Sequence, residues 1–223
     1  MQFGGYIAFK ERGNSVMKYV PEITDKEIAE NRAVSSERRE LYKKRGLDFW
    51  GSREFIAAKA GPFSGEILEV GSGRGNTALY LAKAGYSFTT IDINSEMLKC
   101  VALNLSAEGL MDKADLRLMD AYSMEFSDGS FDNVIMIEAL HHIHDAEKLF
   151  SGLDRVLAFG GKIVLADFNE KGRTIVEKVH SEEGHVHESS SVGAKEATNW
   201  LAGHGYKVQN WEDDCHWLVT GEK

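Results

Sequence analysis

From residue 65 to residue 166, short apolar segments alternate with amphipathic helical segments, and this alternation constrains the fold more than any other feature. The apolar segments have the length of strands, and the segments between them have the length of helices. Strands that alternate with helices pair in parallel, with helices on both faces of the sheet and right-handed crossovers. The predicted strands are 66–70, 87–92, 115–119, 132–137 and 162–166, and the predicted helices are 77–83, 96–107 and 146–157.

The C-terminal part of the chain follows another pattern. A helix is expected over 194–204, and strands are expected over 206–211 and 215–220. The acidic link between the two strands is too short for a parallel crossover, so they should form an antiparallel hairpin. We therefore predict an α/β fold: a doubly wound, mostly parallel, seven-stranded, Rossmann-like sheet that ends in this hairpin.

The residues before this sheet form a separate segment. We expect an N-terminal helical segment over residues 1–60 and the main domain over residues 61–223. Residues 24–60 have a charged helical pattern, and Thr24 with Glu27 predicts a capping box where the first helix begins.

Two roles are open for this N-terminal segment. It could close as a lid over a ligand, or it could pack against the main domain as ordinary scaffold. Residues before Pro21 show no clear period. The aromatic and apolar side chains that either role would use are Tyr42, Leu47, Phe49, Trp50 and Phe55.

Charge and cysteine content restrict the class of protein. The chain has 26 Lys and Arg against 35 Asp and Glu, a formal net charge of −9, which argues against a nucleic-acid partner because the chain would repel a polyanion. The basic cluster at 38–45 is better interpreted as a solvated helix face. Cys100 and Cys215 are expected to be free thiols in a cytoplasmic protein. No apolar run approaches the roughly 20 residues that span a bilayer, so we expect no membrane segment.

A glycine-rich turn follows the first predicted strand. Gly71, Gly73 and Gly75 allow the backbone to turn sharply and to approach a ligand that side chains would block. In open α/β sheets the ligand lies at the carboxyl ends of the strands, where this turn is expected. The dinucleotide-binding pattern G-x-G-x-x-G needs a glycine at position 76, but Asn76 is there.

Two acidic residues make the prediction of the ligand bound at this turn more specific. Glu69 comes just before the glycines, and Asp92 ends the next predicted strand, about twenty residues further on. A carboxylate at that strand end can accept hydrogen bonds from both hydroxyls of a ribose. The pattern therefore favours a ribose-containing ligand over a strand-end cap.

The segment from Glu66 to Phe168 resembles the class I S-adenosylmethionine (SAM)-dependent methyltransferases, and it covers about half of the chain. The resemblance implies SAM as the cofactor. It also implies that the acid and the glycine turn bind its methionine part, that the acid of strand two binds its ribose, and that the residues after strand three contact its adenine. The implied cofactor-binding residues are Glu69, Gly71, Ser72, Gly73, Gly75, Asp92, Ile93, Asp120, Ala121 and Glu138.

The stretch 138–144 follows strand four, which in this family faces the methyl group. His142 or His141 could act there as a general base, since an imidazole titrates near neutral pH. The alternative is that these histidines only shape the pocket. Methyl transfer mainly needs the acceptor to be aligned and water to be excluded, so a catalytic triad is not required.

A histidine-rich stretch lies further along the chain. It is interpreted as an insertion after strand five, of the kind that covers the acceptor pocket in this fold. His180, His185, His187 and Glu188 include types that bind metals, but no cysteine pair accompanies them, and a solvated loop is the commoner explanation. We therefore predict no metal site.

The resulting hypothesis is a SAM-dependent methyltransferase that acts on a small-molecule acceptor. One alternative is a methyltransferase of RNA or protein that works with a partner subunit, and another is a non-catalytic SAM-binding subunit. The sequence carries no signal that identifies the acceptor atom or an oligomeric state.

Overall fold

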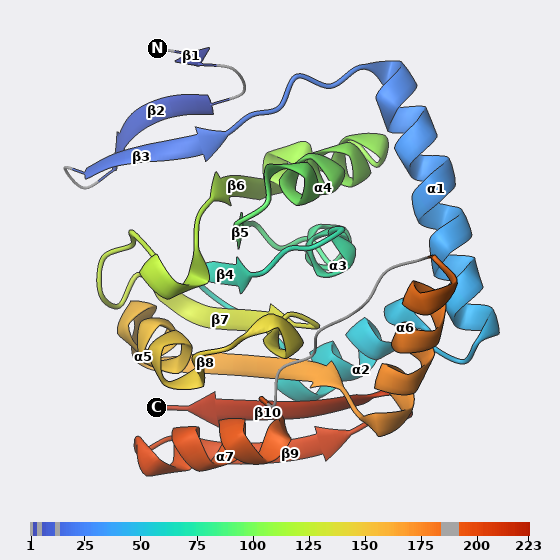
Figure 1. Ribbon diagram of the computed structural model, residues 1–223. Coiled ribbons are helices and arrows are strands. Elements are labelled where there is room, and N and C mark those ends of the chain that lie inside the picture. Colours follow the sequence, from blue (N-terminus) through green and yellow to red (C-terminus); the bar gives the residue numbers. More distant parts are fainter. Residues whose placement is uncertain (1, 4–5, 12–13, 184–191) are drawn as a thin grey trace.

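The computed structural model describes residues 2–3, 6–11, 14–183 and 192–223, with side chains from residue 18 onward. The strands of the main sheet are β4 (Ile67–Val70), β5 (Phe88–Asp92), β6 (Ala114–Leu118), β7 (Phe131–Ile137), β8 (Leu157–Phe168), β9 (Lys207–Glu212) and β10 (His216–Glu222). Their order is β6–β5–β4–β7–β8–β10–β9 (Figure 1). Strands β4 to β8 pair in parallel, whereas β10 is antiparallel to both β8 and β9. The predicted seven-stranded fold with its final hairpin is confirmed.

Helices cover both faces of this sheet because the side chains of its strands alternate. Leu68 and Val70 of β4 belong to the core on one face, and Ile67 belongs to the core on the other. Helices α5 and α7 contribute to the first core, and α2, α3 and α4 contribute to the second. The helices are α1 (Asp25–Lys44), α2 (Phe49–Ala60), α3 (Asn76–Lys83), α4 (Ser95–Ala107), α5 (Ala146–Val156), α6 (Glu170–Glu182) and α7 (Ala194–Gly203).

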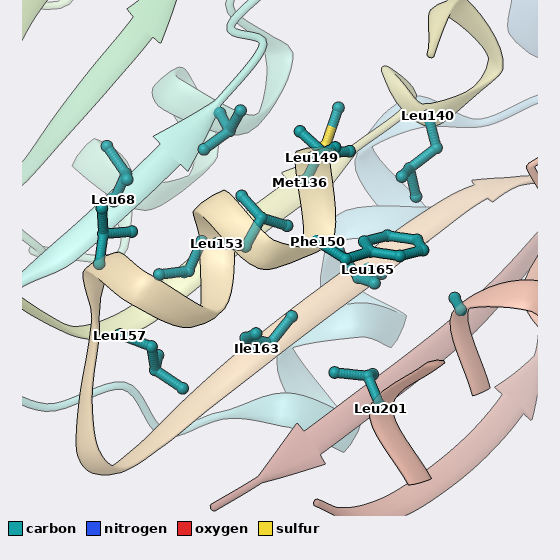
Figure 2. Packing of buried hydrophobic residues seen from close by; sticks show 14 of the residues in the cluster. Leu68, Met136, Leu140, Leu149, Phe150, Leu153, Leu157, Ile163, Leu165 and Leu201 are labelled. Atoms are coloured by element: carbon teal, nitrogen blue, oxygen red, sulfur yellow. The ribbon is translucent and has the colours of Figure 1, made fainter. Parts of the chain in front are cut away.

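Helix α5 shows how one amphipathic helix is fixed on the sheet. Its first residue follows Asp145, whose side chain accepts a hydrogen bond from Lys148 N at 3.0 Å. Leu153 lies three residues after Phe150 and four after Leu149, so the three side chains share one face of the helix and pack against the strands (Figure 2). Burying each of these side chains contributes about 1.5–3 kcal/mol.

The order of the strands creates the position of the site. From β4 the chain runs outward through β5 to β6 and then returns to β7 on the other side of β4. Loops that leave the carboxyl ends of β4 and β7 therefore diverge, and such a switch point is where open α/β sheets bind ligands.

Helix α1 lies along the edge at which β4, β7 and β8 end (Figure 1). Asn31 Nδ2 donates to Asn104 Oδ1 of α4 at 2.9 Å, and Arg45, just after α1, donates to Glu182 of α6 at 3.0 Å. The N-terminal helices are thus fixed across the carboxyl ends of the sheet. The predicted capping box is confirmed, with Thr24 and Glu27 exchanging hydrogen bonds.

Two segments differ from the expectation. Strands β1 (Gln2–Phe3), β2 (Tyr6–Glu11) and β3 (Asn14–Tyr19) form a small antiparallel sheet, so the segment 1–60 is not helical throughout, contrary to the expectation. The alternation that marks a strand is missing because residues 6–9 are all apolar. The stretch after strand five begins with helix α6, so His180 is helical rather than part of an inserted loop.

Candidate active site

The glycine turn connects β4 to α3 in a conformation that needs glycine. Gly71 and Gly75 have φ angles of 77° and 82°, in the left-handed region. The backbone N–H groups of Gly71 and Ser72 both donate to Ile91 O, at 2.9 and 3.1 Å. A Cβ atom on Gly71 would lie only 2.7 Å from the Cβ of Ala139, so the turn packs closely against the segment that follows β7.

Asp92 is fixed at the end of β5, beside this turn. Its Oδ2 accepts hydrogen bonds from Gly73 N at 2.9 Å and from Ser72 Oγ at 3.3 Å. Its Oδ1 accepts from Asn94 N at 2.9 Å. The next residue, Ile93, is 71% exposed, which is unusual for a large apolar side chain.

Asp120 and Ala121 follow the neighbouring strand, β6. The Asp120 carboxylate accepts a hydrogen bond from Tyr122 N at 2.8 Å. Because Met119 N donates to Asp92 O at 3.0 Å, the ends of β5 and β6 lie side by side. The structure therefore brings Asp92, Ile93 and Asp120 to one corner of the sheet.

Glu69 is a buried acid behind the glycine turn. Its Oε2 accepts a hydrogen bond from Thr90 Oγ1 at 2.5 Å, whereas its Oε1 has no hydrogen-bond partner among the described residues. Burial raises the pKa of Glu69 to about 7. A buried carboxyl oxygen of this kind suits a cationic or hydrogen-bond-donating ligand.

A cavity of about 300 Å³ lies between the glycine turn, the segment after β7, and helices α1, α2 and α6. Six residues that were expected at the site line it, namely Gly71, Ser72, Gly73, Glu138, His141 and His142. Asp92, Ile93, Asp120 and Ala121 lie outside its wall, at the corner formed by β5 and β6, and Glu69 and Gly75 are buried in the core beneath.

His141 is held by a carboxylate that the sequence did not reveal. Its Nδ1 lies 2.9 and 3.0 Å from the two carboxylate oxygens of Asp167, and its backbone N–H donates to the same carboxylate at 2.9 Å. An N–H at Nδ1 that donates to Asp167 leaves the basic lone pair of the ring on Nε2. His142 is exposed, with its ring centroid 4.1 Å from that of His141.

Glu138 is the first residue after β7, and it is pinned by two other residues that the sequence did not reveal. Arg53 of α2 forms a bidentate ion pair with it, with one of the two contacts at 2.8 Å. His216 Nε2 lies 2.7 Å from Glu138 Oε1. Glu138 also has a φ of 57°, which is strained for a residue with a side chain.

Charge keeps this buried group ionised. Burial alone would raise the pKa of Glu138, but the charge and hydrogen bonds of Arg53, and then His216, lower it to about 2. Burial alone would lower the pKa of His216, but its contacts with Asp213 and Glu138 raise it above 6.5. The network at the floor of the cavity thus consists of four interacting ionic side chains: Arg53, Glu138, His216 and Asp213.

We expect this network to make stability depend on pH. Because the folded-state pKa of His216 is raised, its contribution is complete below about pH 6.5 and is lost as the pH rises through the folded value. His216→Gln should therefore lower the free energy of unfolding by about 1–3 kcal/mol at pH 6 and by less at pH 9. Urea unfolding at both pH values measures this.

The exposed His204 provides the control, since His204→Gln should change neither value appreciably. A loss for His216→Gln that is equally large at both pH values would contradict the ionic account of the network.

The apolar residues of the N-terminal segment divide between the two roles considered for them. Tyr42 and Phe49 line the cavity, with their ring centroids 4.9 Å apart, whereas Leu47 is fully buried. Phe55 packs against the core, and Trp50 contacts Tyr80 in an edge-to-face arrangement. The segment is therefore both wall and scaffold.

His180 lines the cavity, with its Nε2 3.4 Å from Arg38 Nη2. The other candidates for a metal site, His185, His187 and Glu188, lie outside the described residues. Within the described ranges, no group of three or more His, Cys, Asp or Glu side chains is arranged to hold a metal ion. In the same ranges, no helix combines the length and the apolar character needed to cross a bilayer.

Comparison with known proteins agrees with this geometry. A family model described as a methyltransferase domain matches residues 68–165, from β4 into β8. These residues belong to the class I SAM-dependent methyltransferases. The cofactor of that family is SAM, as the sequence predicted.

Two curated relatives illustrate how far the match extends. Norajmaline N-methyltransferase of Rauvolfia serpentina is 34% identical over 103 residues, 46% of this chain and 35% of that protein. Ubiquinone biosynthesis O-methyltransferase of Xanthomonas axonopodis pv. citri is 25% identical over 166 residues, 70% of this chain and 69% of that protein. The match thus spans about a third of the first relative and about two thirds of the second.

A solved structure shows the same fold. A putative S-adenosyl-L-methionine-dependent methyltransferase from Methanococcus maripaludis superimposes with a TM-score of 0.63 at 18% identity. The superposition covers 89% of this chain and 94% of that one, so the shared fold includes more than the residues matched by the family model.

Proposed function

We propose that this methyltransferase domain transfers the methyl group of SAM to a small-molecule acceptor in the cavity, with His141 as the general base. The observation that supports this most strongly is that one cavity joins the glycine turn to a histidine oriented by a buried carboxylate. The turn provides a place for the cofactor, and the histidine provides a base for the acceptor.

The residues around the turn fit SAM. Gly73, where an added Cβ would meet nothing within 4 Å, leaves the backbone open to the methionine part, and Gly71 and Gly75 provide the left-handed turn. Glu69 offers a buried oxygen to the cationic groups of SAM. Ser72 lies in the same turn and lines the cavity. At the corner formed by β5 and β6, Asp92 would accept hydrogen bonds from the ribose hydroxyls, and the neighbouring residues would contact the adenine. This second group consists of Ile93, Asp120 and Ala121.

SAM carries the reactive group, so the chain has only to take up a proton, orient the acceptor and exclude water. SAM supplies an electrophilic methyl group on a sulfonium, which reacts by in-line displacement. His141 Nε2 takes the proton of a hydroxyl, thiol or amine as the acceptor atom gains the methyl group. Asp167 keeps the imidazole in the required tautomer and stabilises its protonated form. The walls from α1 and α2 exclude water and orient the acceptor.

Of the two histidines considered from the sequence, His141 fits the role of base better than His142. Its ring is largely buried and is fixed by Asp167, whereas His142 is exposed. We assign His142 to the shaping of the cavity. Glu138 is pinned by Arg53 and His216, so we assign it to the support of the cavity floor beside the methyl group.

Product formation tests the proposal. The purified chain is incubated with SAM and with panels of phenols, thiols, amines and hydroxy acids, and S-adenosylhomocysteine is quantified by mass spectrometry. We expect turnover with at least one small-molecule class and none with bulk RNA or a protein lysate. Turnover with a macromolecule alone, or tight SAM binding without turnover in any panel, would refute it.

A further inference from the structure

The wall of the cavity is strongly cationic, although the chain as a whole carries a formal net charge of −9. Four arginines line it, and Glu138 is the one carboxylate among the described lining residues. The arginines are Arg38, Arg39, Arg53 and Arg74. A concave wall that concentrates one sign of charge attracts ligands of the opposite sign.

Two of these arginines are neutralised within the protein. Arg38 pairs with Glu183, and Arg53 pairs with Glu138. Among the described residues, Arg39 and Arg74 have no carboxylate oxygen within 4.0 Å. They provide the positive charge of the cavity that no direct ion pair among the described residues neutralises.

Arg39 is the more confined of the two. It projects from α1 and is partly buried. Burial lowers the pKa of its guanidinium, and the negative charge of Glu108 acts in the other direction and raises it. Glu108 is itself paired with Lys83 at 2.9 Å. A partly buried charge that shares its opposing carboxylate with Lys83 is only partly compensated, and a bound anion would offset the remaining cost.

Arg39 also stands where the cavity continues into a second one of about 200 Å³. Phe49 and Asn76 line both, so the two cavities adjoin along this side of α1. None of the residues Gly71–Gly75 lines the second cavity. Arg74 belongs to the glycine turn, beside the proposed cofactor site. Arg39 lines both cavities, so it also faces the second one, which Lys83 and Glu108 line and the glycine turn does not.

We propose that the methyl acceptor is an anion whose carboxylate or phosphate group is bound by Arg39 while its reacting atom faces His141. This inference rests on the proposed function and names its substrate class. The planar guanidinium of Arg39 donates two parallel hydrogen bonds to such a group. A cationic amine is disfavoured in the same position because it meets the positive charge of the cavity.

Matched acceptors test this on the full chain. The probes are 4-hydroxybenzoate, its neutral amide and tyramine, together with 3-mercaptopropionate, its amide and cysteamine. Their kcat/KM values are compared by S-adenosylhomocysteine formation. We expect the acids to exceed the amides by about tenfold or more, as a charge-assisted hydrogen bond allows. Arg39→Gln should abolish that preference and leave the Kd for S-adenosylhomocysteine unchanged.

Arg32→Gln is the matched control, because Arg32 is an exposed arginine two turns earlier on α1. It should keep the preference for acids. If no probe is turned over, calorimetry in the presence of S-adenosylhomocysteine measures the Kd of each probe. The acids should then bind more tightly than the amides and the amines.

Several results would overturn the inference. They are a preference for amides or amines, no preference at all, a preference that survives Arg39→Gln, and weaker binding of S-adenosylhomocysteine by Arg39→Gln. The last would assign Arg39 to the cofactor. Turnover of neutral probes without a preference for acids would sink this inference and leave methyl transfer standing, whereas absence of SAM binding would sink both.

Discussion

Replacing His141 with alanine should lower kcat by about 10²–10⁴-fold, the usual loss when a general base is removed. The affinity for SAM should not change, because His141 belongs to the acceptor side of the proposed site. Single-turnover measurements with a saturating acceptor, together with calorimetric titration of SAM, separate the two effects. An acceptor that is already a thiolate needs no base, so the loss should shrink for thiols as the pH rises.

Asp167 provides a positioning test of the same hypothesis. Asp167→Asn removes the carboxylate that selects the Nδ1–H tautomer of His141, so kcat should fall by a comparable factor. Asp167→Glu should recover part of the activity, which a merely structural role would not predict. His142→Ala is the matched control and should lose less than about tenfold in kcat. Equal losses for His141→Ala and His142→Ala would contradict the assignment of the base.

Gly71→Ala should weaken SAM binding by about 100-fold, since a displacement of about 1 Å in a site can cost that much. The new Cβ would lie 2.7 Å from the Cβ of Ala139, and ordinary contacts between such atoms begin near 3.4 Å. The glycine turn must therefore shift away from the segment after β7. Calorimetry with S-adenosylhomocysteine measures the loss.

Gly85→Ala separates this steric effect from backbone strain. Gly85 has a φ of 90°, yet a Cβ there meets nothing within 4 Å. Both substitutions carry the cost of a left-handed residue, about 1–2 kcal/mol of stability, but Gly85→Ala should keep its affinity for SAM. Equal affinities of the two variants for SAM would show that the close approach of Gly71 to Ala139 has no bearing on the site.

The central elements were predictable because their signals are local. The helix α4 begins after Asn94, whose side chain caps it, and Gly109 follows its end with a φ of 69°. The glycine turn is equally local, since its conformation depends on residues that lack side chains. Patterns failed where the local signal was weak, as in the apolar run of residues 6–9 and in the mainly polar helix α6.

The partners within the site were not predictable, because the fold and not the sequence brings them together. Asp167 is 26 residues from His141, and Arg53 is 85 residues from Glu138. Their approach depends on β7 and β8 being neighbours and on α2 packing beneath the same strand ends. A parallel sheet predicts only that side chains after adjacent strands lie near each other, and not which of them pair.

Calorimetric titration of the purified chain with SAM, compared with Asp92→Ala, bears most directly on the central claim that the β4 turn and the end of β5 form one cofactor site. The carboxylate of Asp92 holds Gly73 and Ser72 and is proposed to bind the ribose. We expect one equivalent of SAM to bind the wild-type chain and the affinity of the variant to fall at least about tenfold, as loss of charged hydrogen bonds implies. No binding to the wild-type chain, or equal affinities in both proteins, would contradict the account.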